Sequence, residues 1–201
     1  MITRDYDGLV DAIAGWLHKP GLLPQIPTFI MLAESRIYRK LRVRGMESAF
    51  EVTVAGGTAP LPERYVELKH IRADGQRPLA RKSPAWIYEQ YPIGAAGGAP
   101  QFFARDGEAL IFGPAPSNGL KLKGMYYKRP TPLGDENPSN WFTENAFDLL
   151  MFGALCEAAP YMANDARIQV WEAKFGSLLD DMGTEDDNEA TSGPALSLSI
   201  G

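Results

Sequence analysis

Apolar residues recur at helical spacing in the first part of the chain. They occupy every third or fourth position from Tyr6 to Leu17, which predicts a helix that ends before Pro20. A second stretch with the same period begins with Pro27 in its first turn and stops near Gly45. We therefore expect residues 1–46 to form an N-terminal helical hairpin.

The pattern changes in the middle of the chain, where glycine and proline interrupt any long helix. Alternating apolar and polar residues predict strands at 49–54, 65–73, 101–104, 109–112 and 120–128. Asp74-Gly75 predicts a tight hairpin turn that leads into a strand at 77–79, and Asp106-Gly107 predicts a second hairpin. Ser83 and Pro84 open a short helix. Residues 47–138 are thus expected to be a β-rich insertion with five or six short strands and one short helix.

Helical spacing returns after Pro138. Two apolar stripes predict a helix that ends before Pro160 and a longer one from about Asp165 to Glu189, which at 1.5 Å per residue would be roughly 38 Å long. We expect this C-terminal helix pair, residues 139–189, to pack on the first hairpin, and residues 190–201 to form an extended tail. The predicted fold class is α+β, a four-helix core with a small β-rich insertion.

Composition and charge exclude several classes of protein. No apolar run approaches the roughly 18 residues of a membrane span, and the N-terminus shows no signal pattern, so we expect neither a membrane nor a secreted protein. Cys156 is the single cysteine, and the two histidines, His18 and His70, stand in no ligand spacing. We predict no catalytic, cofactor-binding or metal-binding residues, and no enzyme.

The net charge of −5 is unevenly distributed. Residues 1–45 hold seven bases and four acids, residues 46–130 hold eleven and eight, and residues 131–201 hold two and thirteen. A chain divided in this way can attract a second copy of itself head to tail. The acidic cluster between Asp180 and Glu189 lacks the spacing of a calcium loop and is interpreted as a solvated helix end.

Three features are candidate contact surfaces. A basic run near the end of the second helix predicts a subunit interface or a patch that faces a lumen, with a solvated helix face as the alternative; its members are Arg36, Arg39, Lys40, Arg42 and Arg44. The tail alternates Leu196, Leu198 and Ile200 with small polar residues, which suggests a docking strand or a disordered terminus.

The third candidate is an aromatic set in the β-rich insertion. Its members could stack single-stranded nucleic acid or form the core of a small sheet with lysines on the wet face. The set comprises Trp86, Tyr88, Tyr91, Phe102, Phe103, Phe112, Tyr126 and Tyr127, beside Lys121, Lys123, Lys128 and Arg129.

Four collinear segments resemble the head-to-tail adaptor (connector) proteins of tailed, especially short-tailed, bacteriophages. They are YDGLVDAIAGWLHK, IPTFIMLAESRIYRKLRVRGME, LPERYVELKHIR and NPSNWFTENAFDLLMFGALCEAAPYMANDARIQVWEAKF. The segments from Pro27 to Ile37 and from Ala159 to Arg167 are the most specific, and together the four cover roughly residues 3–182.

The resemblance implies a virion structural protein with no enzymatic activity. Such proteins form a homo-oligomeric ring, usually a dodecamer, that binds the portal protein and carries the tail or nozzle protein, while DNA passes through the lumen without sequence-specific binding. We therefore expect a location at the portal vertex of the virion and in the host cytoplasm during assembly. A nucleic-acid-binding accessory protein and another tail ring, such as a terminator or nozzle component, remain as alternatives. A hydrolase that uses carboxylates is a weaker alternative, because no nucleophile stands beside a base.

Overall fold

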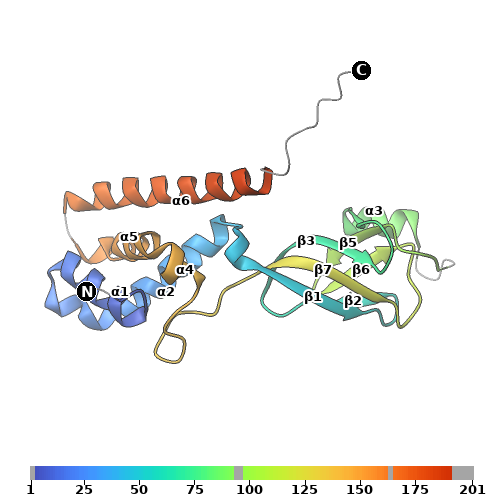
Figure 1. Cartoon of the computed structure of the whole chain (residues 1–201), viewed down its shortest axis with the longest axis horizontal. Coiled ribbons are helices and arrows are strands. Elements are labelled where there is room, and N and C mark those ends of the chain that lie inside the picture. Colours follow the sequence, from blue (N-terminus) through green and yellow to red (C-terminus); the bar gives the residue numbers. More distant parts are fainter. Residues whose placement is uncertain (1–2, 93–96, 163–164, 192–201) are drawn as a thin grey trace, which may run out of the picture. The chain divides into compact units, whose positions relative to one another are not determined.

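The computed structural model describes residues 3–92, 97–162 and 165–191, and the chain divides into two compact units (Figure 1). Unit 1 comprises residues 1–45 and 130–201, and unit 2 comprises residues 46–129. Unit 1 is helical, and unit 2 holds the strands. The expected mixed α+β class is therefore confirmed.

Two helices from the first 45 residues belong to unit 1. Helix α1 (Tyr6–Leu17) is capped by Asp5, whose carboxylate accepts from the Gly8 N–H at 2.9 Å. A 3-10 helix, η1 (Pro20–Gln25), leads into α2 (Ile26–Lys40), which has Pro27 in its first turn as expected.

Helix α2 ends at Lys40, five residues before Gly45, near which the sequence predicted its end. Leu41 has extended backbone, and both Leu41 and Val43 are buried, which is the alternation of extended chain. The guanidinium of Arg42 donates to the carbonyls of Tyr38 and Leu41 at 3.1 and 2.7 Å, which satisfies groups that the helix end leaves open. The prediction of helix up to Gly45 was wrong because burial of Leu41 and Val43 prevails over helix propensity. A short 3-10 helix, η2 (Arg44–Met46), follows.

The remaining helices of unit 1 come from the last part of the chain. Asn140 caps the short helix α4 (Trp141–Asn145) in a capping box with Thr143. Helix α5 (Phe147–Glu157) and the 3-10 helix η3 (Ala159–Tyr161) precede α6 (Arg167–Thr191), which is about as long as predicted. The sequence pattern had not separated α4 from α5.

Helix α5 is the centre of unit 1. It contacts α1, α2, α4 and α6 (Figure 1). Of its eleven residues, Asp148 alone is exposed. A helix that is apolar on all sides must be covered on all sides. Gly153 lets α2 and α6 approach this helix closely, since a methyl group at this position would lie 3.0 Å from the Phe175 ring of α6 and 3.1 Å from Ala33 Cβ of α2.

A buried carboxylate joins α2 to the chain segment that returns from unit 2. Glu34 is only 3% exposed, and its oxygens accept from the Tyr38 hydroxyl at 2.8 Å and from the Leu133 N–H at 3.2 Å. A buried acid needs such donors, because burial without them would strongly disfavour its charge. Glu34 therefore fastens the segment around Leu133 to the helices.

Unit 2 contains two sheets. The first has the order β1-β7-β3 and is antiparallel, and the second has the order β2-β6-β5-β4. Their strands are β1 (Glu47–Thr53), β2 (Thr58–Pro60), β3 (Tyr65–Ala73), β4 (Ala80–Arg81), β5 (Phe102–Asp106), β6 (Ala109–Gly113) and β7 (Lys121–Lys128). Helix α3 (Pro84–Gln90) is capped by Ser83, as predicted.

One of the two predicted hairpins is confirmed, and of the other the turn is confirmed but the second strand is corrected. Strands β5 and β6 pair antiparallel around Gly107, which has the positive φ of 58° that the turn requires. The predicted tight turn at Asp74-Gly75 also forms, with Gly75 at a φ of 73° and the Gln76 N–H donating to the Ala73 carbonyl at 3.1 Å. After this turn the Leu79 N–H donates to the Ile71 carbonyl, and the chain then leaves the first sheet. Strand β4 pairs parallel with β5 in the second sheet, so the expected strand at 77–79 is not formed.

Alternation along β5 and β6 divides the apolar residues of unit 2 between two cores. Phe103, Leu110 and Phe112 join the core formed with residues of the first sheet, which include Leu122 and Tyr126. Ala104 and Ile111, which are adjacent to these residues in the strands and face the opposite side, instead join Ile87 of α3 in a second core. Helix α3 thus covers the other face of the second sheet.

Two glycine substitutions test the tight packing around α5. Gly153→Ala and Gly176→Ala each replace a glycine inside a helix. Because alanine has the higher helix propensity, the exchange by itself stabilises a helix by about 1 kcal/mol. Position 176 in α6 has open space around it, so we expect Gly176→Ala to raise the free energy of unfolding by about 0.5 to 1 kcal/mol. At position 153 the contacts of 3.0 and 3.1 Å add an overpacking cost of roughly 1 to 3 kcal/mol, so we expect a net loss of stability.

Urea unfolding followed by the helical circular dichroism signal measures both effects. If the two exchanges stabilised the chain equally, α5 would not be closely packed at Gly153.

Candidate interaction surfaces

The five residues of the basic run do not form one surface. Arg36 lies inside unit 1, where its guanidinium donates to both carboxylate oxygens of Glu172 on α6, at 3.1 and 2.7 Å. It also lies 3.5 Å from a carboxylate oxygen of Glu157 and 4.5 Å from the centre of the Phe175 ring. Arg36 therefore links α2 with α5 and α6.

The other four members differ in exposure and position. Arg39 and Lys40 are exposed on the last turn of α2, and Arg44 is exposed beyond the helix. Arg42 is half-buried and bonds to backbone carbonyls of the helix end. Arg39, Lys40 and Arg44 are thus the members that a neighbouring molecule can reach.

A groove of about 530 Å³ lies in unit 1 between the end of α2 and α6. Its floor includes Leu41 and Leu179, and Lys40 and Asp180 also line it. Gly176 and Gly183 widen the groove on the α6 side, since nothing lies within 4 Å of a methyl group built on either residue. The groove therefore contains both a positive charge, that of Lys40, and an acidic residue of the same unit, Asp180.

The last turns of α6 carry the acidic cluster. The helix extends to Thr191, and Asp180 and Asp181 are exposed on it. The predicted docking tail, with Leu196, Leu198 and Ile200, lies outside the described residues. It stays a prediction.

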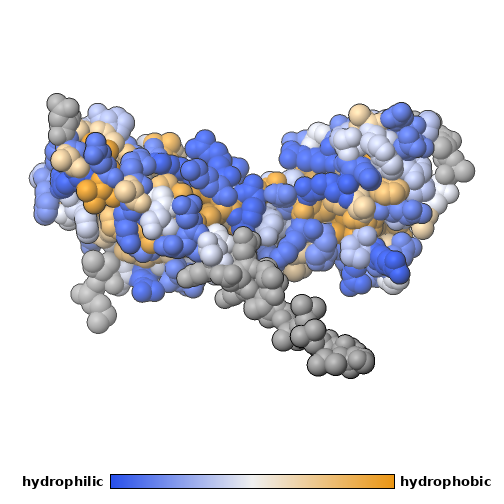
Figure 2. Space-filling view, turned by 90° about the horizontal axis from the view of Figure 1, so that it is seen from above, coloured by the Kyte–Doolittle hydropathy of each residue, from blue (hydrophilic) through white to orange (hydrophobic). Residues whose placement is uncertain are grey.

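The aromatic set of unit 2 serves mainly as core. Phe103, Phe112 and Tyr126 are buried between the sheets, as the core interpretation predicted. The lysines of β7 form ion pairs on the exposed surface, Lys121 and Lys123 with Glu51 and Lys128 with Glu63. On the face shown in Figure 2, hydrophilic residues form a band across unit 2 with apolar residues beside it.

A groove in unit 2 combines cations and aromatic rings that the sequence did not bring together. It has a volume of about 350 Å³, and the cations that line it are Arg81, Lys82 and Arg105. Tyr65 of β3 and Phe103 of β5 also line it. The sequence signal was weak because these residues lie up to 40 positions apart and meet only where β3, β4 and β5 approach one another. We call this site the cation groove.

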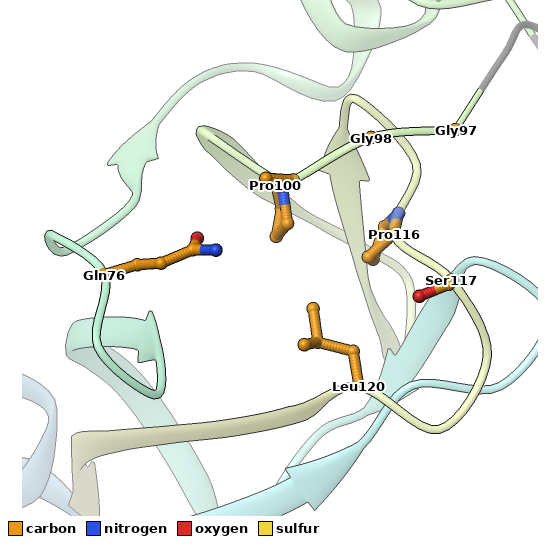
Figure 3. A pocket seen from close by; sticks show the side chains of 8 residues that line it. Gln76, Gly97, Gly98, Pro100, Pro116, Ser117 and Leu120 are labelled. Atoms are coloured by element: carbon orange, nitrogen blue, oxygen red, sulfur yellow. The ribbon is translucent and has the colours of Figure 1, made fainter.

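A second pocket in unit 2, of about 540 Å³, has a different chemistry. Figure 3 shows Pro100, Pro116 and Leu120 pointing toward its centre, with Gln76 on the opposite side. Gly97, Gly98, Ala99 and Ser117 complete the lining. These groups include no acid, base or thiol, so this pocket offers no pair for acid–base or nucleophilic catalysis.

The residues with the greatest intrinsic reactivity lie apart from one another. Cys156 is buried, and its burial together with the nearby Glu172 raises the pKa of the thiol to about 12. His18 has left-handed backbone at the end of α1, and His70 is exposed on β3. Among the described residues, no group of three or more histidine, cysteine or acidic side chains could hold a metal ion. None of the described helices is both long and apolar enough to cross a membrane.

The surfaces described above carry charged and aromatic side chains on a mixed α+β chain. Comparison with known families identifies the family of this chain. The chain belongs to the SU10 adaptor protein family, which it matches over residues 4–197. The resemblance to phage adaptor proteins found in the sequence is thereby confirmed. Comparison with curated proteins gave no match.

Replacement of Arg36 tests its structural role. Arg36→Met removes a bidentate ion pair and a cation–π contact, and we expect it to lower the free energy of unfolding by about 1 to 2 kcal/mol near neutral pH. Arg39→Met removes an exposed arginine one turn later on the same helix and should change stability by less than about 0.5 kcal/mol. Equal effects of the two substitutions would show that the Arg36 contacts add nothing.

The loss should also depend on pH. Hydrogen bonds from Arg36 lower the pKa of Glu172 below its ordinary value of 4.5. A carboxylate with a lowered pKa contributes stability above the pKa of the unfolded state, and this contribution is lost as the pH falls through the folded-state pKa. We therefore expect the difference in stability between wild type and Arg36→Met to shrink below about pH 4.5, as measured by urea unfolding across the acid range.

Proposed function

We propose that the chain forms a homo-oligomeric ring, a dodecamer in its simplest form, between the portal and the tail or nozzle of a phage virion. DNA passes through the lumen of this ring without sequence-specific binding, and the chain catalyses no reaction. Membership of the SU10 adaptor protein family over nearly the whole chain is the observation that carries this proposal.

The helical unit supports a structural role. Four long helices, α1, α2, α5 and α6, are joined through the enclosed α5 and through Arg36, which ties three of them together. A rigid helical core of this kind suits a subunit that must transmit a fixed angle to its neighbours around a ring. We propose that it is the four-helix adaptor core expected from the sequence, formed by the hairpin of residues 1–46 and the pair of residues 139–189, with 47–138 as the insertion.

Charge supports association between copies. Unit 2 has a surplus of bases over acids, whereas residues 131–201 have thirteen acids and two bases. A closed ring uses two different faces of each subunit, so opposite charge on different faces favours it. The exposed Arg39, Lys40 and Arg44 belong to a face that meets a neighbouring subunit or lines the lumen, and the tail with Leu196, Leu198 and Ile200 docks on the portal or on the next subunit.

The proposal of an accessory nucleic-acid-binding protein has less support. It relied on the basic run from Arg36 to Arg44 and on the lysines near Tyr126. Arg36 already pairs with Glu172, and Lys121, Lys123 and Lys128 pair with acids of their own unit. Paired lysines release fewer counterions from a nucleic acid backbone and therefore add little affinity.

Binding to the purified portal tests the proposed function. We expect the chain to add a ring to the portal in a fixed number of copies, measured by mass photometry of the portal alone, the chain alone and the mixture. Electron cryomicroscopy of virions should place the chain at the vertex that carries the tail. Absence of binding to the portal, or a location elsewhere in the particle, would rule out the adaptor ring.

Reversal of charge on α2 tests the exposed part of the basic run. We expect Arg39→Glu with Lys40→Glu to reduce the number of copies on the portal while the thermal unfolding curve stays close to that of wild type, because neither side chain is buried. Lys19→Glu with Lys174→Glu, two exposed lysines of the same unit outside the run, is the matched control. Rings with the full number of copies would place Arg39 and Lys40 on the lumen or the solvent side.

A further inference from the structure

The cation groove of unit 2 holds its positive charges in place through aromatic rings. The Arg81 guanidinium lies 5.7 Å from the centre of the Phe103 ring, and the Arg105 guanidinium lies 5.3 Å from that of Tyr65. The Lys82 ammonium lies 4.9 Å from the centre of the Trp86 ring. Contact with a ring attracts a cation without cancelling its charge, so the groove keeps a positive potential.

One carboxylate, that of Glu67, lines this groove beside the three cations. Arg81 pairs with Glu67 at 3.2 Å, but no acid of the described ranges lies within ion-pair distance of Lys82 or Arg105. On the first sheet of the same unit, Lys69, Lys121, Lys123 and Lys128 all pair with acids. The groove therefore presents two unneutralised cations, Lys82 and Arg105, that contact with aromatic rings already holds in place. Binding of a partner would cost little further side-chain entropy.

The end of α6 has the opposite property. Between Asp180 and Glu189 the sequence holds six acids, and no base follows Lys174 in the chain. The C-terminal end of a helix carries a partial negative charge, which favours cations and disfavours acids. Helix α6 extends to Thr191 with no base in its last turn. This helix end is thus electrostatically unfavourable by itself and would be stabilised by contact with a cationic surface.

We propose that the cation groove of one copy receives the acidic end of α6 of a second copy. The contact joins two different surfaces, so it repeats head to tail and closes into a ring at the appropriate angle. Its place within a ring rests on the proposed function, whereas the contact itself is testable in solution without the portal.

Charge favours this occupant over a nucleic acid. Binding to a phosphate backbone at physiological salt commonly uses six or more cationic contacts, whereas the groove supplies about two surplus charges. The net charge of −5 also repels a polyanion. The acidic helix end, by contrast, is present once for every groove.

Charge reversal on each side tests the contact. The groove variant is Lys82→Glu with Arg105→Glu, which spares Arg81 because that residue also donates to the Leu68 carbonyl. The helix variant is Asp186→Lys with Asp187→Lys. The matched control is Arg72→Glu with Arg77→Glu, two exposed arginines of unit 2 that do not line the groove. Circular dichroism and thermal unfolding establish that each variant is folded.

Sedimentation velocity of the full-length chain at increasing concentration and low salt measures self-association. We expect each of the two variants to raise the dissociation constant at least about tenfold and the control to leave it unchanged. Added salt should weaken the wild-type contact, because exposed charges are screened. An equimolar mixture of the groove variant and the helix variant should associate again, since the reversed groove then meets the reversed helix end.

Several results would overturn the contact between copies. A wild-type chain that stays monomeric at millimolar concentration excludes it, as does a mixture of the two variants that fails to associate. Loss of binding to a single-stranded oligonucleotide in the groove variant, with unchanged self-association, would identify a nucleic acid site instead. If the groove variant formed normal rings on the portal, the contact between copies would be refuted and the adaptor function would stand. If the wild-type chain never bound the portal, the adaptor function alone would be refuted.

Discussion

Enclosure of α5 is the constraint on which unit 1 depends. Seven of its eleven residues are buried and Asp148 alone is exposed, so the helix is stable only when other helices cover it on all sides. The covering helices come from both ends of the chain, α1 and α2 from the first 45 residues and α6 from the last part. The two ends must therefore fold together, and the β-rich unit is inserted between them. Gly153 sets how closely α2 and α6 can approach the central helix.

Polar contacts give this enclosure a defined register. Arg36 reaches from α2 to Glu157 of α5 and Glu172 of α6, and Glu34, also on α2, accepts a hydrogen bond from the Leu133 N–H. Each contact satisfies a polar group that apolar packing alone would leave costly. Hydrophobic burial thus brings the helices together, while the contacts of Arg36 and Glu34 tie α2 to particular residues of α5, α6 and the segment around Leu133.

Aromatic residues have two roles in unit 2. Those that alternate inward on β5, β6 and β7 fill the space between the sheets and give a small unit a substantial apolar core. Tyr65 and Trp86 instead lie beneath cations near the surface. The same residue type therefore stabilises the fold in one place and in the other keeps positive charge exposed and ordered, which is a useful property for a protein that assembles through its surface.

The local pattern of the sequence determined most of the elements. The helical periods and the capping residues Ser83 and Asp5, together with the turn at Gly107, act within a few residues of chain, and the helices, α3 and the β5–β6 hairpin follow from them. The family resemblance also came from the sequence, because it rests on collinear segments. The end of α2 and the course of the chain after Gly75 did not follow, since burial of Leu41 and Val43 and the pairing of β4 with β5 depend on distant parts of the chain.

The candidate surfaces were less accessible to prediction. In the sequence, Arg36 is one of five equivalent bases, and only the packing of α2 against α6 turns it into an internal link while Arg39 and Lys40 stay exposed. Arg81, Lys82 and Arg105 give no pattern in the sequence and form one groove only when three strands meet. Periodicity therefore determined which residues turn inward, because that choice is local. Which charges are neutralised and which remain available to a partner was decided by tertiary structure, because ion pairs join residues far apart in the chain.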